Sequence, residues 1–135
     1  MELTIRPLSE SDYQGILVGW WADWGWVPPQ VDFLPQDGTG GIMVMDGEEP
    51  VCAGFMYATN SAVAWVDWII SSKTYREKPK RKEAIELLIL TLTEIAKQSG
   101  FKYVYALLKS SSLIEVYKEI GYVKGDSATE MIKVL

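Results

Sequence analysis

Three apolar segments separated by short turns constrain the fold of this chain more than any other feature. They cover residues 42–45, 51–57 and 63–70. Asp46–Gly47 follows the first segment, and an Asp-Gly pair between two strand-like segments is a strong hairpin signal. Residues 59–61, Thr-Asn-Ser, are typical of a second turn. The sequence therefore predicts an antiparallel meander of three strands.

A long helix is predicted after the meander, from about Lys80 to Gln98. Apolar residues recur there at helical spacing and extend over two faces: Ile85, Leu87, Leu88, Ile89, Leu90, Leu92 and Ile95. Gly100 is a suitable helix end. Residues 101–108 are predicted as a strand. Because a crossover from strand through helix to strand is nearly always right-handed, we expect this strand to lie parallel to residues 63–70.

The remaining elements complete the predicted sheet. They are a strand at 2–6, a helix that begins after Ser9 or Ser11, a short helix at 113–120 capped by residues 110–112, and strands at 122–123 and 131–134. We therefore expect a single domain over residues 1–135 with an α+β (mixed α/β) fold. Its central sheet would be mixed, mostly antiparallel, of about seven strands, with helices on both faces.

Basic residues are concentrated between the meander and the long helix. Six of the thirteen in the chain fall within ten positions: Lys73, Arg76, Lys78, Lys80, Arg81 and Lys82. Cations at a helix N-terminus are disfavoured by the helix dipole, by about 0.3–1 kcal/mol each at exposed sites. The cluster makes more sense if an anion binds there, held by backbone N–H groups and side chains. A solvated, charged loop is the alternative.

The two halves of the chain differ in charge. Residues 1–70 hold ten acids and one base, a formal charge of −9, and residues 71–135 hold eight acids and twelve bases, +4, which sum to −5. A duplex-DNA binder usually has a broad basic face, so this distribution argues against duplex nucleic acid as a partner. The acidic half would attract a cation such as an amine substrate.

Cysteine, histidine and hydropathy exclude several classes of site. Cys52 is the single cysteine and the chain has no histidine, so neither a zinc or other transition-metal site nor a Cys–His catalytic pair is expected. Residues 1–10 do not have the pattern of a signal peptide. No uncharged segment reaches the ~18–20 residues that cross a bilayer. We expect a cytoplasmic protein that does not bind membranes.

Two local sequences resemble the GNAT superfamily of N-acetyltransferases. Residues 110–122 resemble the family's Asn-Pro-x-x-x-x-x-Tyr-x-x-x-Gly-Phe stretch, with Ser110 in the Asn place and Tyr122 in the Phe place. Residues 75–81 stand where the family has Arg-x-x-Gly-x-Gly, the loop that wraps the pyrophosphate of acetyl-CoA. Pro79 and Arg81 occupy the two glycine positions, and Pro79 removes one N–H donor. The order of elements over the whole chain is also similar to that family.

The resemblance implies roles for individual residues. Tyr117 stands where the family has a general acid for the departing thiolate, although it could equally pack its ring on the sheet. Asp67, among apolar neighbours, is the candidate base; a base acting through water and a structural Asp are the alternatives. Acetyl-CoA, or another acyl-CoA, is the implied co-substrate, with no metal. The residues expected to bind it are Trp68, Ile69, Ile70, Arg76, Lys78, Lys80, Arg81, Lys82 and Ser110.

Four tryptophans lie within seven residues: Trp20, Trp21, Trp24 and Trp26. Gly25 and the prolines that follow prevent one long helix, so the segment is predicted to bend into a loop or a second short helix. In the resembling family this region forms part of the acceptor pocket, so the indoles would bind an amine, with cation–π attraction of ~0.5–2 kcal/mol. Alternatively, two or three of them belong to the core or to the contact of a homodimer.

Together these features predict an acetyl-CoA-dependent N-acyltransferase. The acceptor would be an amine of a small molecule or protein, which attacks the thioester directly. A catalytically degenerate GNAT-like binding or adaptor protein is the first alternative. The second is a nucleobase-modifying relative, since small GNAT-like proteins of this compact type look like those carried by bacteriophages, some of which modify DNA.

Overall fold

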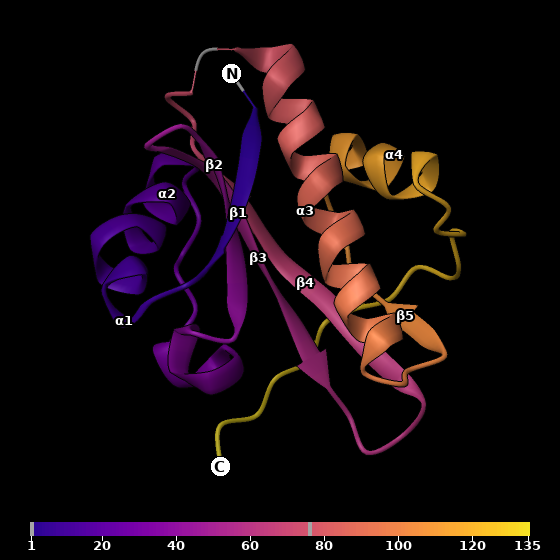
Figure 1. The fold of residues 1–135 in the computed structure, drawn as a ribbon. Helices are drawn as coiled ribbons and strands as arrows, with labels where there is room; N and C mark the ends of the chain where they lie inside the picture. Colours follow the sequence, from indigo (N-terminus) through magenta and orange to yellow (C-terminus); the bar gives the residue numbers. More distant parts are fainter. Residues whose placement is uncertain (1, 76) are drawn as a thin grey trace.

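A computed structural model, which describes residues 2–75 and 77–135, shows one five-stranded sheet with helices on both faces (Figure 1). The strands are β1 (Leu3–Pro7), β2 (Gly41–Asp46), β3 (Glu49–Ala58), β4 (Val63–Ser71) and β5 (Tyr103–Tyr105). They lie in the order β1-β2-β3-β4-β5. The first four pair antiparallel, and β4 pairs parallel with β5. The predicted meander and the predicted parallel crossover are both confirmed.

Helices cover the two faces of the sheet unequally. On one face α1 (Glu10–Asp12), a π-helical stretch (Tyr13–Leu17) and α2 (Val18–Asp23) run without interruption. On the other face lie α3 (Lys78–Gln98) and α4 (Ser111–Glu119) (Figure 1). Two 3₁₀ turns, Val31–Phe33 and Pro35–Gly38, lead from α2 back to the sheet.

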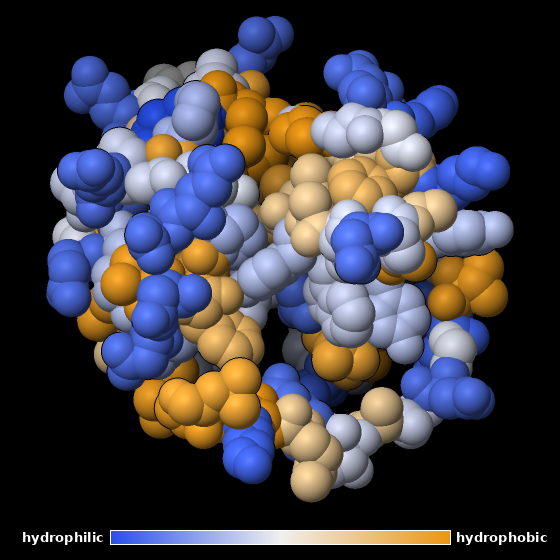
Figure 2. All heavy atoms as spheres, turned by 90° about the horizontal axis from the view of Figure 1, so that it is seen from below, coloured by the Kyte–Doolittle hydropathy of each residue, from blue (hydrophilic) through white to orange (hydrophobic). Residues whose placement is uncertain are grey.

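The prediction of about seven strands is wrong, because the described residues form five. Residues 122–123 and 131–134 lie outside any strand, and the strand predicted at 101–108 is paired only over Tyr103–Tyr105. A strand needs a neighbour for its backbone groups, and β5 offers only this short edge. Seen from below, the end of the molecule where the chain terminates exposes hydrophobic side chains around a hollow (Figure 2). Among the exposed residues are Met131 and Val134, at 86% and 91%.

Local sequence signals explain the hairpin and the long helix. Gly47 has φ 63°, the left-handed conformation that the Asp-Gly turn requires. Helix α3 begins with a proline in its first turn and ends before Gly100, whose φ is 94°. Apart from the adjacent pair Leu88 and Ile89, its buried residues lie three or four positions apart: Ala84, Leu88, Ile89, Leu92 and Ala96. None of the helices in the described ranges combines the length and hydropathy of a bilayer-crossing helix.

The core has a layer on each side of the sheet, because successive strand residues face opposite ways. The layer under α2 contains Leu17, Trp21, Met43, Ala53, Phe55 and Ile70. The layer under α3 contains Val44, Val51, Cys52, Val66, Leu88 and Leu92. Cys52 is 0% exposed, so its thiol belongs to the packed interior.

An ion pair ties the first strand to the first helix. Both guanidinium NH₂ groups of Arg6 donate to the carboxylate of Asp12, at 2.7 and 3.0 Å. The same carboxylate accepts from the backbone N–H of Ser9 at 2.7 Å, as in a capping box. The hydrogen bond from Arg6 is the main cause that lowers the pKa of Asp12, although burial opposes it.

We expect Asp12→Asn to lower the free energy of unfolding by about 2 kcal/mol at pH 7, because a charge-assisted hydrogen bond contributes roughly 1.5–3 kcal/mol. A carboxylate with a lowered folded-state pKa stabilises the protein above its unfolded-state pKa. This contribution is lost as the pH falls through the folded-state pKa. The deficit of the variant in urea unfolding should therefore shrink on acidification. Glu10→Gln, on the same short helix, is the control and should change stability by less than about 0.5 kcal/mol.

Candidate functional site

In the described ranges, no strand pairs with the second half of β4 on the β5 side. Pairing between β4 and β5 covers only Val63–Trp65 and Tyr103–Tyr105, whereas β4 continues to Ser71. A cavity of about 500 Å³ lies beyond the divergence, among the end of β4, the first turns of α3, helix α4 and the loop after α2. Its lining residues are Trp24, Trp26, Ile69, Ile70, Ser71, Lys78, Arg81, Lys82, Ile85, Ser110, Ser112, Leu113, Glu115, Val116 and Glu119.

A bulge in β4 shapes the wall of this cavity. Ala53 pairs with Ile70 and Phe55 pairs with Asp67, so two β4 residues lie opposite Gly54 alone. Trp68, the first of the two, has φ 56°, an uncommon conformation for a side chain of this size. A Cβ on Gly54 would lie 2.5 Å from Ile69 Cδ1, so a larger residue there would displace the end of the Ile69 side chain. The bulge thus brings Ile69 and Ile70 to the cavity, while the ring of Trp68 packs on Trp21.

Three of the basic side chains line the cavity together. Lys78, Arg81 and Lys82 stand at helical positions i, i+3 and i+4, so they share one face of α3 with Ile85. Lys80 lies on another face and forms an ion pair with Asp46 at 3.3 Å.

Asp46 also accepts from the hydroxyl of Tyr75 at 2.7 Å. Lys80 therefore has its ion-pair partner outside the cavity that Lys78, Arg81 and Lys82 line. Arg76, also predicted to contact phosphate, lies outside the described residues.

Arg81 is suited to an anion. Its Nη2 donates to the backbone carbonyls of Lys73 and Tyr75, which fixes the side chain beneath the basic loop. Its Nε is buried and has no hydrogen-bond partner in the described parts of the chain. A buried donor without an acceptor costs about 1–3 kcal/mol. Side chains such as that of Arg81 are better donors to a phosphate group here than the backbone of residues 77–80, because Pro79 has no N–H.

Acidic residues reduce the positive charge of the same cavity. Glu115 and Glu119 line it from α4. Lys82 Nζ lies 3.2 Å from a carboxylate oxygen of Glu119, and both side chains are about half exposed. Such a pair contributes little and can rearrange when a stronger anion binds. The sequence reasoning missed these two acids and the apolar lining residues Ile85, Leu113 and Val116, although helical spacing from Lys78 and Arg81 would have identified Ile85.

Ser110 performs a local structural role at the edge of the cavity. Its hydroxyl caps α4 by accepting from the backbone N–H of Leu113 at 3.4 Å. The base of the cavity is apolar, since Ile70 and Val116 are buried at 2% and 7% exposure. The mouth is polar and the base is apolar, so a ligand with a charged end and a less polar end would match it.

Tyr117 is buried on α4, beside the cavity rather than among its lining residues. It is 2% exposed, and its hydroxyl donates to the backbone carbonyl of Val66 at 3.2 Å. The ring packs edge-to-face on Tyr122, with centroids 4.8 Å apart. Burial is the main cause that raises the pKa of Tyr117, so the phenol stays protonated at neutral pH.

Asp67 connects β4 to the chain after β5. Its Oδ2 accepts from Trp65 Nε1 at 3.0 Å and from the backbone N–H of Leu107 at 3.3 Å. Its Oδ1 accepts from the backbone N–H of Trp68 at 2.9 Å. Burial raises the pKa of Asp67 and outweighs these hydrogen bonds, which lower it. Asp67 does not line the cavity. It lies where β4 and β5 diverge, so a change in its charge would alter the electrostatic potential at that point.

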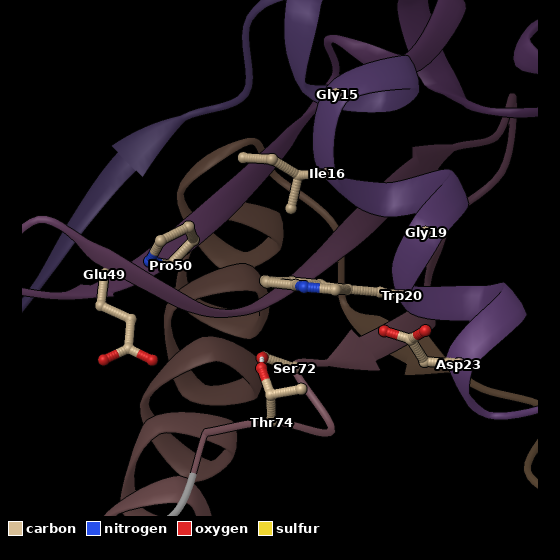
Figure 3. Close-up of a pocket in the computed structure, with 9 residues that line it drawn as sticks. All are labelled: Gly15, Ile16, Gly19, Trp20, Asp23, Glu49, Pro50, Ser72 and Thr74. Carbon is tan, nitrogen blue, oxygen red and sulfur yellow. Dashed lines mark hydrogen bonds between the residues drawn. The ribbon is translucent and has the colours of Figure 1, made fainter.

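The four clustered tryptophans divide into two pairs. Trp21 is 1% exposed and lies in the core. Trp20 is 9% exposed and forms the floor of a second, shallower hollow of about 370 Å³, where Figure 3 shows its indole between Ile16 and the hydroxyls of Ser72 and Thr74. Trp24 and Trp26 line the larger cavity. The structure thus places the second pair with the basic side chains predicted to bind the co-substrate.

No metal site is evident in the described parts of the chain, where no three His, Cys, Asp or Glu side chains come together. The sequence matches no protein-family model. It also matches no curated protein. The chain is, however, similar in structure to solved proteins.

Solved acetyltransferase structures superpose on nearly the whole chain. An acetyltransferase from Trypanosoma brucei is 17% identical, with a TM-score of 0.67 over 98% of this chain and 100% of its own. AAC(6')-Iy, solved with a bisubstrate analogue that contains CoA, is 13% identical, with a TM-score of 0.67 over 100% of both chains. An aminoglycoside acetyltransferase from an uncultured soil metagenomic sample, solved with sisomicin, is 11% identical, with a TM-score of 0.69 over 98% of this chain and 96% of its own.

At these identities the similarity concerns the fold. It extends over nearly the whole chain in each case. The chain therefore shares the fold of these acetyltransferases, as its resemblance to the GNAT superfamily predicted.

Proposed function

We propose that this protein is an acetyl-CoA-dependent N-acyltransferase that acetylates the amine of a small molecule. The observation that carries the proposal is the cavity at the divergence of β4 and β5. It combines Lys78, Arg81 and Lys82 at its mouth with an apolar base. Acyl transfer itself is supported by the acetyltransferases that share the fold. An acceptor of small size is supported by the relatives that act on aminoglycosides and glucosamine-6-phosphate.

Acetyl-CoA fits the cavity in two respects. Its diphosphate would accept from Lys78, Arg81 and Lys82, since Arg and Lys bind phosphate oxygens through charge-assisted hydrogen bonds. Its pantetheine arm would lie along Ile69 and Ile70 at the unpaired half of β4. When bound, acetyl-CoA supplies an acyl group on a thiol that is a good leaving group.

The residues of the chain would then move two protons. Asp67, or a water that it orders, accepts the proton that the acceptor amine must lose before it attacks. Tyr117 donates a proton to the departing thiolate, and burial keeps its hydroxyl protonated for that purpose. Both groups lie at one level of β4, because Tyr117 bonds the carbonyl of Val66 and Asp67 is the next residue. No covalent enzyme intermediate is required.

Calorimetry with acetyl-CoA tests the binding half of the proposal. We expect saturable heat and a rise in melting temperature, because a ligand that binds only the folded state stabilises it. Turnover is then measured as thiol release with a panel of aminoglycosides, amino sugars and diamines. If millimolar acetyl-CoA gives no heat and no thermal shift, the proposal fails.

A non-catalytic binding protein is the second candidate. It is favoured by the internal hydrogen bonds of the two proposed catalytic groups, since the hydroxyl of Tyr117 and both oxygens of Asp67 already have partners. In that case acetyl-CoA would bind but no amine of the panel would release its thiol. Loss of binding on charge reversal at Arg81 and Lys82 would then identify an anion-binding adaptor.

Tyr117→Phe is expected to lower kcat about tenfold while leaving the affinity for acetyl-CoA unchanged. The effect should fall below the ~10²–10⁴-fold range of general acids, because a thiolate with a pKa near that of cysteine leaves readily without help. Steady-state kinetics and calorimetry on the same preparation measure the two quantities. Unchanged kcat would remove Tyr117 from the mechanism and leave the cofactor site intact.

Asp67→Asn is expected to move the acidic limb of the pH profile of kcat/KM to the higher pH at which the acceptor amine itself loses its proton. In the native protein a base must be ionised, so activity should fall as the pH drops through the pKa of Asp67, which burial raises above the usual carboxyl value. The variant should be about tenfold slower at pH 7, with a profile set by the amine alone. An identical acidic limb in the variant would show that another group takes the proton.

A further inference from the structure

Trp26 is an exposed aromatic residue whose backbone is rigidly held. Gly25, with φ 78°, ends α2, and its N–H donates to the carbonyl of Ala22 at 2.9 Å. The N–H of Trp26 donates to the carbonyl of Trp21, also at 2.9 Å. These two hydrogen bonds are those of a Schellman cap, which fixes the exit direction of the chain. The indole of Trp26 is nevertheless 51% exposed.

The ring of Trp24 packs against one face of this indole. The Nε1 of Trp24 donates to the carbonyl of Ser71, the last residue of β4, at 2.8 Å. Lys73 Nζ lies 5.3 Å from the centre of the Trp24 ring and donates to the carbonyl of Asp23. The rings of Trp24 and Trp26 are nearly parallel, at 26°, with centroids 6.3 Å apart. Trp26 is thus the outer member of a stacked pair anchored on β4.

This pair forms one wall of the cavity that contains the three cations. Lys78, Lys82 and Trp26 are all exposed and lie at its mouth, whereas the apolar base is formed by buried residues such as Ile70 and Val116. Charged donors beside an available aromatic face match a ligand that joins phosphate to a planar heteroaromatic ring. Base–aromatic stacking contributes about 1–3 kcal/mol for each base. Because the indole is already positioned, little ordering cost opposes that gain.

We propose that Trp26 is a binding residue for the adenine ring of an adenine nucleotide whose phosphates bind Lys78, Arg81 and Lys82. The inference rests on the proposed function, in which that nucleotide is the end of acetyl-CoA. It assigns Trp24 and Trp26 to the co-substrate, where the sequence had suggested the acceptor amine. Trp24 is the positioning residue of the pair, and Trp26 is the one that touches the base.

Three probes separate the parts of the ligand: acetyl-CoA, ADP and inorganic diphosphate. We expect Trp26→Ala to weaken acetyl-CoA and ADP about tenfold each, within the range of base stacking. Diphosphate, which has no base, should bind with unchanged affinity. Trp26→Phe should restore binding to within about threefold of the native protein, because a smaller ring still stacks. Val27→Ala, a neighbouring residue that is 88% exposed and does not line the cavity, is the matched control.

The remaining outcomes distinguish failure of this inference from failure of the proposed function. If acetyl-CoA weakens but ADP does not, the indole contacts the pantetheine arm. If diphosphate weakens equally, Trp26 supports the loop and not the base. If the native protein binds acetyl-CoA and Trp26→Ala binds it equally well, the inference fails while the proposed function stands. If the native protein binds neither acetyl-CoA nor ADP, both fail together. ADP binding that depends on Trp26 without acetyl transfer would uphold the inference alone.

Discussion

A protein carrying both Lys78→Glu and Lys82→Glu is expected to bind acetyl-CoA about 100-fold more weakly than the native protein. The two ammonium groups line the mouth of the cavity, and each would donate a charge-assisted hydrogen bond to a phosphate oxygen. Loss of two such bonds, at roughly 1.5 kcal/mol each, corresponds to about two orders of magnitude in affinity. Isothermal calorimetry at fixed ionic strength measures the change.

The control for this experiment carries the same change of charge elsewhere. Lys102→Glu with Lys124→Glu alters the net charge equally at two exposed positions that do not line the cavity. Its affinity should stay within about twofold, because distant surface charges are screened at physiological salt. An equal loss in both double variants would mean that net charge, and not this site, governs binding.

Gly41→Ala is expected to lower the free energy of unfolding by at least about 3 kcal/mol, or to prevent folding. A Cβ at Gly41 would lie 2.3 Å from the backbone oxygen of Gly54 and 2.7 Å from Phe55 Cδ2. Both neighbours belong to β3, so relief would require β2 and β3 to move apart at the centre of the sheet. The free-energy cost of such overpacking is at or above the upper end of the usual range of about 1–3 kcal/mol. Urea unfolding, with expression yield as a second measure, shows the effect.

Gly19→Ala is the matched comparison, since it makes the same chemical change in α2. A Cβ there meets nothing within 4 Å, and alanine is favoured over glycine in a helix by about 0.5–1 kcal/mol. This variant should therefore be more stable than the native protein. If Gly41→Ala unfolded within 1 kcal/mol of the native protein, the close approach of the two strands would be contradicted.

Elements with local signals could be predicted from the sequence, and elements defined by distant partners could not. Asp46–Gly47 fixes its hairpin through the conformation of two adjacent residues. Residues 131–134 have the composition of a strand, but a strand forms only where a neighbouring strand offers backbone partners. β5 has only three residues, and residues 131–134 do not pair with it. The bulge at Trp68 was also beyond prediction, because it follows from how Gly54 and Ile69 pack across two strands.

The positive charge of the candidate site was predicted from the sequence, but only some of the residues that line it were. The cluster of cations correctly drew attention to the start of α3, but helical phase separates Lys80, which pairs with Asp46, from Lys78, Arg81 and Lys82. The three hydrogen bonds that Asp67 accepts could not be inferred, because Leu107 donates one of them from forty residues away. Burial of the hydroxyl of Tyr117 against β4 is equally a product of the folded arrangement.

The complete burial of Cys52 has a practical consequence for the chemistry of this protein. Burial raises the pKa of that thiol, so the group that reacts with maleimides and aromatic disulfides, the thiolate, is scarcely present in the native state. Reagents that count free thiols would therefore report the CoA released in turnover without a background from the enzyme. A cysteine introduced at a chosen surface position could be labelled in the otherwise native sequence, and slow modification of Cys52 would time the opening of the core.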